Sequence, residues 1–408
     1  MKCGLLGAKL GHSYSPQIHS YLGEYSYSLF EKSPEEVDIF LKSSNFTGIN
    51  VTIPYKSTVI AYCDELSPIA RRLGAVNVLV RHENGKLIGH NTDYFGFRTM
   101  LRRSGLSVKN KKALVLGTGG ASKTAVAVLE DLGAKVITIS RSGENNYSNL
   151  NRHTDAAIIV NTTPVGMFPD TGSAPLSIDI FPKLEGVLDV IYNPARTQLL
   201  MEAERQGLIT MNGLLMLVAQ AKEAAEWFTG KPIDDSKIDD IYTLLQKQME
   251  NIILIGMPGS GKSTIGRLVA ESLGKEFIDA DARIAEKAGC TIPEIFANHG
   301  QSAFRKIETE VLKEIGNLSG KVIATGGGCV TRAENYPLLH QNGSIFYLKR
   351  ELSVLATDGR PLSQAMPLEE LYRTRKPLYE SFADYNIDNN GTASEAADEI
   401  LRIWEERK

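Results

Sequence analysis

A glycine-rich turn after an apolar strand constrains the fold of this chain more than any other feature. Residues 256–264 read GMPGSGKST after the strand NIILI and match the pattern GxxxxGK[ST]. Backbone amides of such a turn surround nucleotide phosphates, and a helix follows. The sequence therefore predicts a P-loop α/β domain in which Lys262 neutralises the phosphates and Ser263 binds Mg²⁺. The other expected cradle residues are Gly256, Gly259, Ser260, Gly261 and Thr264.

Charged residues downstream indicate what this site acts on. Asp279 and Asp281 leave the next strand as D-A-D, and residues two apart in an extended segment point the same way. We expect one to hold Mg²⁺ through water and the other to address an acceptor hydroxyl, although such pairs are commonly just solvated. Three arginines and a glycine cluster follow, namely Arg305, Arg360, Arg375 and 326–328. Arginine matches carboxylates bidentately, so they indicate a small carboxylate-bearing acceptor, although each alone would read as a surface charge.

A second glycine-rich turn, GTGGASK at residues 117–123, follows the strand ALVL. Gly117, Gly119 and Gly120 match the first glycines of the dinucleotide fingerprint, and Ala121 lies beside them. Ser122 replaces the usual last glycine or alanine. The pattern predicts a pyrophosphate site at a helix N-terminus; the alternative is a tight strand–helix turn without a ligand.

The end of the next strand indicates which dinucleotide binds. A carboxylate there would bind the ribose 2′-hydroxyl of NAD, but this sequence has Ser140 and Arg141, followed by another serine. A guanidinium beside hydroxyls can donate to a 2′-phosphate, so we expect NADP(H). The alternative is a solvated surface arginine.

The composition is that of a folded, multidomain chain. Its 408 residues predict two to four compact units. A formal charge of -3 is too balanced for a protein that mainly grips nucleic acid. No apolar run approaches the roughly 20 residues of a membrane span, and no signal-peptide core is visible, so we expect a cytoplasmic protein. The four cysteines lie far apart and are expected to be reduced thiols.

The order of the patterns predicts three α/β units. Residues 1–104 open with a strand and a helix that Ser15 caps and Pro16 begins, and they form a substrate-binding domain. Residues 105–230 alternate strands, a glycine turn and helices, as in a Rossmann-type NADP-binding domain. The amphipathic segment 231–249 is a candidate for packing back on the first domain. The P-loop domain occupies 250–408.

Taken in order, the motifs resemble those of two enzyme families. The first half is similar to shikimate dehydrogenase through GHSYSP, INVTIPYK, GAVNVL, HNTDYFG, GTGGASK, NTTPVGM, DVIYNPARTQLL and GLLMLVAQA. The second half resembles shikimate kinase through GMPGSGKST, FIDADARI, FRKIE, ATGGG, GRPL and RKPLY. The resemblance covers nearly the whole chain. It implies a bifunctional enzyme of aromatic amino acid biosynthesis, with a nucleoside-monophosphate-kinase-like fold in its second half.

The first resemblance implies NADPH-dependent reduction of 3-dehydroshikimate to shikimate. It makes Lys56 and Asp93 the catalytic pair, and an ammonium beside a carboxylate can indeed protonate a developing alkoxide. Without it, Lys56 would read as an exposed lysine. The residues it places around the substrate are Ser13, Ser15, Asn50, Thr52, Asn77, Tyr192 and Gln220. Gly213, which opens the helix GLLMLVAQAKEAAEWF, is placed near the nicotinamide.

The second resemblance implies transfer of the γ-phosphate of MgATP to the 3-hydroxyl of shikimate. Asp281 would orient the acceptor, while Arg305 and Arg375 hold its carboxylate. The remaining implied roles are a close backbone approach at Gly327, a lid residue over the phosphates at Arg360, and a magnesium-associated carboxylate at Asp279. Catalysis would be mostly positioning and charge neutralisation.

Two segments depart from these families. About 20 residues separate Arg141 from Asn161, so we expect one crossover of the NADP-binding domain to be missing or irregular, at the adenosine end of its site. The kinase lid around 357–366 is short and lacks basic residues ahead of Arg360 that would cover adenine.

Two other functions fit parts of the pattern. The first half could prefer quinate or use NAD, joined to a kinase for another small polyol acid. A non-catalytic shikimate sensor would be expected to have lost Lys56, Lys262 or Asp281, and all three are present. The sequence leaves the oligomeric state open.

Overall fold

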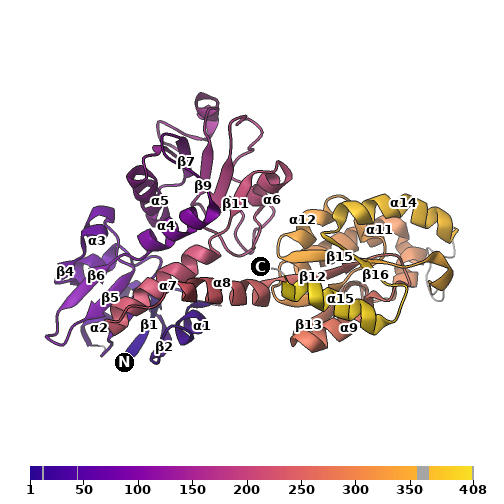
Figure 1. The fold of residues 1–408 in the computed structure, drawn as a ribbon, viewed down its shortest axis with the longest axis horizontal. Coiled ribbons are helices and arrows are strands. Elements are labelled where there is room, and N and C mark those ends of the chain that lie inside the picture. Colours follow the sequence, from indigo (N-terminus) through magenta and orange to yellow (C-terminus); the bar gives the residue numbers. More distant parts are fainter. Residues whose placement is uncertain (12, 44, 356–366, 407–408) are drawn as a thin grey trace. The chain divides into compact units, whose positions relative to one another are not determined.

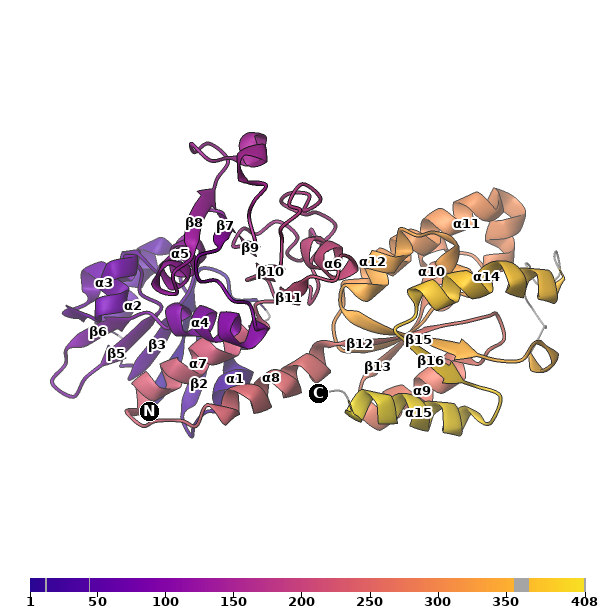
Figure 2. The ribbon, with the colours of Figure 1, turned by 45° about the horizontal axis from the view of Figure 1, so that its top comes forward.

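The computed structural model describes residues 1–11, 13–43, 45–355 and 367–406. The chain forms two compact units, one of residues 1–167, 173–192 and 199–244, the other of 168–172, 193–198 and 245–408. Both are built from strands and helices in alternation, as Figures 1 and 2 show. Among the described helices, none is long and apolar enough to cross a membrane. All four cysteines are free thiols.

The N-terminal part of the first unit is a six-stranded mixed sheet. Its strands are β1 (Lys2–Gly7), β2 (Ser26–Glu31), β3 (Gly48–Val51), β4 (Glu65–Leu66), β5 (Val78–Arg81) and β6 (Leu87–His90), in the order β2-β1-β3-β5-β6-β4. The helices of this part are α1 (Ser15–Ser20), α2 (Pro34–Ser43), η1 (Thr58–Tyr62), α3 (Pro68–Leu73) and α4 (Asp93–Ser104). Val37 of α2, Val59 and Ala70 bury one face of the sheet, and Phe228 of α7 (Leu214–Thr229) contacts the other. The loops that contain Ser13 and Thr52 begin at the carboxyl ends of β1 and β3.

Helix α1 begins differently from the prediction. Its N-cap is Tyr14, no side chain caps it, and Ser15 is its first residue, so the expectation that Ser15 caps the helix is wrong. Pro16 does lie in the first turn, where a missing N–H costs nothing. The Ser15 hydroxyl instead acts as a hydrogen-bond donor to Tyr27 on β2.

The second sheet of this unit has five parallel strands. They are β7 (Lys112–Leu116), β8 (Lys135–Ile139), β9 (Ile158–Asn161), β10 (Gly186–Asp189) and β11 (Ile209–Met211), in the order β11-β10-β9-β7-β8. Helices α4 and α5 (Gly120–Asp131) cover one face, and α6 (Gln198–Arg205) lies on the other. Strand order reverses at β7, so the turn after β7 opens where ligands of such sheets bind.

The crossover from β8 to β9 is irregular, as expected from its length. It contains only the 3₁₀ segment η2 (Tyr147–His153), which Asn146 and Asn149 cap reciprocally. No further strand is added beyond β8 among the described residues, so β8 remains an edge strand of the sheet. The short segment therefore replaces a strand–helix excursion with a capped loop.

Helix α8 (Ser236–Met249) follows α7. Its first turns attach to the first unit through an ion pair between Arg103 and Asp239 at 2.6 Å. Just before it, Asp235 pairs with Lys222 of α7 at 2.9 Å. Ile238 and Ile241 are buried. The residues of α8 from Leu245 onward belong to the second unit.

The second unit is built on five parallel strands, β12 (Asn251–Ile255), β13 (Glu276–Asp279), β14 (Lys321–Ala324), β15 (Gly343–Lys349) and β16 (Tyr385–Asp388), in the order β13-β14-β12-β15-β16. Its helices are α9 (Lys262–Leu273), α10 (Ala280–Ala288), α11 (Ile292–Gly316), η3 (Cys329–Thr331), α12 (Asn335–His340), η4 (Leu352–Val354), α14 (Leu368–Phe382) and α15 (Ala393–Glu406). Helices α9 and α15 cover one face, while α10, α11, α12 and α14 cover the other (Figure 2). The sheet carries the P-loop between β12 and α9, at its centre.

Candidate active sites

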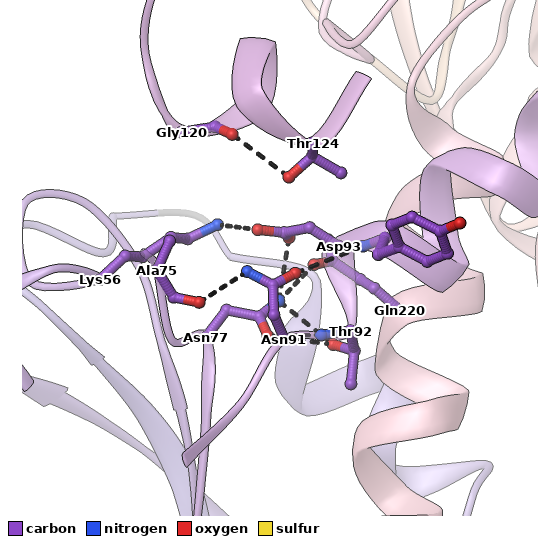
Figure 3. A network of polar contacts seen from close by, with 10 residues as sticks. Lys56, Ala75, Asn77, Asn91, Thr92, Asp93, Gly120, Thr124 and Gln220 are labelled. Carbon is purple, nitrogen blue, oxygen red and sulfur yellow. Dashed lines mark hydrogen bonds and ion pairs between the residues drawn. The ribbon is translucent and has the colours of Figure 1, made fainter. Parts of the chain in front are cut away.

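The first candidate site is a polar network around Lys56 and Asp93 (Figure 3). The Lys56 Nζ lies 2.6 Å from Oδ2 of Asp93, which is only 4% exposed. The Asn77 amide donates to Oδ1 of Asp93 at 2.9 Å and to Oε1 of Gln220 at 3.2 Å. Each carboxylate oxygen thus has its own donor, which fixes the carboxylate next to the ammonium.

The local fold explains how these residues meet. Asp93 opens α4, where the helix dipole favours a carboxylate. The preceding Thr92 donates its backbone N–H to Oδ1 of Asn77 at 2.7 Å, which orients the Asn77 amide toward Asp93. Gln220 projects from α7, which packs along α4. Figure 3 draws Gly120 and Thr124 of α5 above the Lys56–Asp93 pair, with the Thr124 hydroxyl donating to the Gly120 carbonyl at 3.2 Å.

The remaining expected substrate residues form a second group. Ser13 accepts the backbone N–H of Ser15 on its hydroxyl, at 3.2 Å. Asn50 lies near the end of β3 and accepts a hydrogen bond on Oδ1 from the Tyr27 hydroxyl, at 2.8 Å. Tyr192 follows β10, and its ring meets Tyr14 edge-on with centroids 6.3 Å apart.

Thr52 is the expected substrate residue that is least tied to the others. It follows β3, and its backbone N–H donates to the Leu6 carbonyl at 2.9 Å. In the described residues no hydrogen bond joins its side chain to the network. Its place beside the end of β1 is therefore set by the backbone.

Sequence reasoning missed residues that hold this site together. Thr92 lies within a quoted motif but carried no assigned role, and Tyr27 lies on β2 outside every motif. The alternation of polar and apolar residues in SYSLFE, residues 26–31, marks a strand without saying which partner Tyr27 meets. In the second unit, Glu308 and Tyr379 were also given no role. They lie inside the FRKIE and RKPLY motifs, and this membership was the sequence feature that could have pointed to them.

The turn after β7 has the geometry of a dinucleotide site. Gly117 has a φ of 107°, and a Cβ there would lie 3.0 Å from Oγ1 of Thr162, so a larger residue would be strained. Gly119 is the N-cap of α5 and Gly120 its first residue, and a Cβ on either would meet no described atom within 4 Å. Ser122, in place of the usual glycine or alanine, is buried and donates to the Gly117 carbonyl at 2.7 Å. Open space at the end of a 12-residue helix fits a pyrophosphate.

The other expected NADP contacts lie just after β8 and at the starts of α5 and α7. Ser140 follows β8 and accepts the Gly143 N–H on its hydroxyl at 2.8 Å, while Arg141 is exposed. Ala121 is the second residue of α5. Gly213 caps α7, and a Cβ there would lie 2.0 Å from the Val190 carbonyl oxygen. Only glycine fits this approach of α7 to the end of β10.

The second candidate site is a pocket of about 360 Å³ in the second unit, lined by the P-loop. Gly259 and Gly261 have φ values of 86° and 83°, which glycine adopts without strain. Lys262 is buried and donates to the carbonyls of Gly256 and Met257 at 3.0 Å each. The Ser263 hydroxyl donates to Oδ2 of Asp279 at 2.6 Å. A hydroxyl and a carboxylate beside the phosphate cradle are ligand types that Mg²⁺ takes together with nucleotide phosphates.

The P-loop residues do not all face the pocket. Gly259, Gly261 and Thr264 line it with Lys262 and Ser263, whereas Gly256 and Ser260 are not among its lining residues. Ser260 is fully buried, and its carbonyl accepts from the Asn389 amide. Gly256 and Ser260 therefore belong to the turn without lining the pocket. The described residues contain no cluster of three or more His, Cys, Asp or Glu side chains suited to a metal ion.

Asp279 and Asp281 reach the pocket by a different path from the predicted one. Asp279 ends β13 and caps α10, with its Oδ1 accepting the Asp281 N–H at 3.0 Å. Asp281 lies in the first turn of α10, so the prediction that both sit on one extended segment is wrong. Both line the pocket all the same, because the chain turns into the helix at the mouth of the P-loop.

The pocket is also lined by two arginines, Arg305 and Arg375. Arg305 is buried and its Nη1 lies 2.5 Å from Oε2 of Glu308, which is 0% exposed. Burial raises the pKa of Glu308. Arg375 donates to the Gly327 carbonyl at 3.0 Å, and the Tyr379 hydroxyl donates to the same oxygen. The pocket thus presents two guanidiniums next to a glycine turn. Arg360 and the lid segment lie outside the described residues.

Comparisons with known proteins fit both sites. The family model of the shikimate dehydrogenase substrate binding domain matches residues 5–79, and that of shikimate kinase matches 258–405. A shikimate dehydrogenase (NADP(+)) from Clostridium perfringens strain SM101 is 38% identical over 265 residues, covering 60% of this chain and 97% of that protein.

Solved structures agree over the same part of the chain. Shikimate dehydrogenase 1 from Peptoclostridium difficile is 40% identical, with 60% of this chain and 97% of that chain covered and a TM-score of 0.56. Shikimate 5-dehydrogenase from Thermus thermophilus, solved with NADP(H) and shikimate, is 32% identical, with 59% and 98% covered and a TM-score of 0.55. The chain belongs to the shikimate dehydrogenase family and continues into a shikimate kinase domain.

Proposed function

We propose that this bifunctional enzyme reduces 3-dehydroshikimate with NADPH and then phosphorylates shikimate with MgATP. The observation that carries the first step is the 2.6 Å ion pair of Lys56 and Asp93, held by Asn77 in front of the α5 turn. The P-loop pocket, which Arg305 and Arg375 also line, supports the second step. The product of one site is then the substrate of the other.

In the reduction, NADPH supplies the hydride to the ketone carbon. Lys56 donates a proton to the developing alkoxide, and Asp93 orients the ammonium and stabilises its charge. Ser13, Ser15, Asn50, Thr52, Tyr192 and Gln220 surround the substrate in this proposal. Gly117, Gly119, Gly120 and Ala121 hold the pyrophosphate, while Ser140 and Arg141 bind the 2′-phosphate and Gly213 lies by the nicotinamide. The close contacts that a Cβ would make at Gly117 and Gly213 support the assignments of these two glycines.

In the phosphorylation, Arg305 and Arg375 bind the substrate carboxylate and Asp281 orients its 3-hydroxyl. Lys262 leaves its loop carbonyls for the phosphate oxygens, and Ser263 with Asp279 holds Mg²⁺. Arg360 completes the charge neutralisation. Positioning in a pocket of this size supplies most of the rate enhancement.

The domain boundaries follow the same division. We assign 1–104 to substrate binding, with 231–249 packing back on it, 105–230 to NADP binding and 250–408 to the kinase. The ion pair of Asp239 with Arg103 of α4 supports the packing of 231–249 on residues 1–104, while the pair of Asp235 with Lys222 also ties this segment to α7. NADPH, ATP and four free thiols are consistent with a cytoplasmic enzyme.

A coupled assay on the purified chain tests the proposal. NADPH oxidation with 3-dehydroshikimate and ADP formation after addition of MgATP should both occur, with equal final amounts of shikimate 3-phosphate and oxidised NADPH. A parallel reduction with NADH tests the cofactor, and oxidation of quinate with NADP⁺, compared with oxidation of shikimate with NADP⁺, tests the substrate. Turnover of quinate without turnover of 3-dehydroshikimate, or no ADP formation with shikimate, would overturn it.

A further inference from the structure

Behind Asn50 lies an aromatic cluster that the reaction steps do not use. It consists of His19 on α1, Tyr25, Tyr27 on β2, and Phe228 on α7. The His19 ring stacks on Tyr27 with centroids 4.0 Å apart and an interplanar angle of 12°, and it stacks on Phe228 at 5.7 Å. His19 is 1% exposed, so the cluster is a rigid support beneath the substrate residues.

The cluster fixes the direction of each hydrogen bond at Asn50. The Tyr27 hydroxyl lies 2.8 Å from Oδ1 of Asn50, and a carbonyl oxygen only accepts, so Tyr27 donates. Ser15 in turn acts as a donor to the Tyr27 oxygen. The hydrogen bonds therefore run from Ser15 through Tyr27 to Asn50, with the Tyr27 hydroxyl accepting from Ser15 and donating to Asn50.

His19 favours the same orientation of the Asn50 amide. Its Nδ1 lies 2.7 Å from the Tyr25 hydroxyl. Burial lowers the pKa of His19 to about 3, while Asn50 acts in the opposite direction, as an acceptor facing the ring does. If the Asn50 amide were flipped, its N–H₂ group would face the His19 ring and the Tyr27 O–H. Its Oδ1 would then lose both hydrogen-bonding neighbours.

The amide nitrogen is left for the pocket. Among the described residues, no hydrogen bond engages Nδ2 of Asn50, which is half-buried at the carboxyl end of β3. We infer that Tyr27, supported by His19, is a positioning residue that locks the Asn50 amide with its N–H₂ group toward an oxygen of the substrate. This inference rests on the proposed dehydrogenase function and assigns the lock to a residue outside the site's motifs.

Removing one hydroxyl tests the lock. Tyr27→Phe keeps the ring and its stack on His19 but removes the donor to Oδ1. Loss of one neutral hydrogen bond predicts a rise of about threefold to tenfold in KM for 3-dehydroshikimate, with kcat changed less than about twofold. KM for NADPH and the rate of shikimate phosphorylation should not change. Tyr21→Phe removes an exposed hydroxyl at the end of α1 and is the matched control.

A double-mutant cycle separates a lock from a general structural effect. If Tyr27 acts through Asn50, Tyr27→Phe should add nothing to KM in the Asn50→Ala background. Additive effects, or an unchanged KM in Tyr27→Phe alone, would overturn the inference. Calorimetry of shikimate binding reads out the lock independently of turnover when the same four proteins also carry Arg305→Ala and Arg375→Ala, which removes the carboxylate site proposed for the kinase pocket. A protein with this double change and an intact Tyr27 and Asn50 that binds shikimate but does not reduce 3-dehydroshikimate would contradict the proposed function, and the affinities would still decide on the lock.

Discussion

At the scale of single residues, the two sites place their charges by different means. Lys56 pairs with Asp93, and the other oxygen of this carboxylate accepts from Asn77. Lys262 donates instead to the carbonyls of its own loop, which phosphate oxygens can replace. The Lys56 ammonium is therefore held by a carboxylate, whereas in the proposed function Lys262 exchanges its loop carbonyls for the nucleotide phosphates.

Replacing each lysine should silence one reaction only. Lys56→Ala removes the proton donor, and loss of a general acid predicts a fall of about 10²- to 10⁴-fold in the rate of NADPH oxidation with 3-dehydroshikimate. The same preparation should form ADP from shikimate at the wild-type rate. Lys262→Ala should do the converse. Loss of both reactions in either variant would contradict two independent sites.

His19 predicts a pH dependence of stability in the first unit. Its pKa is about 3 in the folded chain because of burial, against 6.5 when unfolded. Between these values the unfolded chain binds more protons, so the free energy of unfolding falls as pH falls from 6.5 toward 3. One buried histidine accounts for up to about 1.4 kcal/mol per pH unit in this window.

Urea unfolding of the wild type and of His19→Phe between about pH 7 and pH 4 measures this contribution. Phenylalanine can stack on Tyr27 and Phe228 but does not titrate, so the slope of stability against pH should be shallower in the variant. Equal slopes would show that another group governs the acid sensitivity of this unit.

At the scale of elements, the glycine turn after β14 shapes the part of the P-loop pocket that Arg305 and Asp281 line. A Cβ on Gly328 would lie 2.0 Å from Nη2 of Arg305, and one on Gly326 would lie 2.7 Å from Oδ1 of Asp281. Neither contact can be relieved at the glycine, because the turn is packed against both side chains. The turn therefore sets where the guanidinium and the carboxylate stand.

Gly328→Ala should displace Arg305 and weaken shikimate binding in the kinase. Loss of a charge-assisted hydrogen bond predicts a rise of about 10- to 100-fold in KM for shikimate in the phosphorylation, with the dehydrogenase reaction unchanged. Gly172→Ala is the control, since a Cβ there meets no described atom within 4 Å. A normal KM in Gly328→Ala would show that Arg305 does not bind the acceptor.

The sequence was most informative where structure is local. Both glycine turns follow the strands predicted for them, because apolar strands and glycine spacing leave few alternatives. The sequence-based prediction was wrong where a contact between distant segments, or a cap at an element boundary, overrode a local pattern. Ser15 donates to Tyr27 instead of capping α1, and Asp281 enters α10 because Asp279 caps that helix. The meeting of Tyr27 with Asn50 depends on β1 pairing with both β2 and β3, which no single segment encodes.

At the scale of the whole molecule, one chain carries two consecutive reactions, and that linkage alone does not transfer shikimate between sites. Two separate enzymes at equal concentration produce a lag in shikimate 3-phosphate formation that is set by KM and Vmax of the kinase. Shikimate released from the dehydrogenase must pass through solution in that case. A direct transfer would shorten the lag and make it insensitive to added kinase.

We expect the lag of free diffusion, because each site is complete within its own unit. The Lys56–Asp93 network lies in the first unit, and the P-loop pocket is lined by residues of the second. An equimolar mixture of Lys56→Ala and Lys262→Ala chains places the two active sites on different molecules. Stopped-flow coupling of NADPH oxidation to ADP formation should give the same lag for this mixture as for the wild type at equal site concentration. A shorter lag for the wild type would establish transfer within the chain.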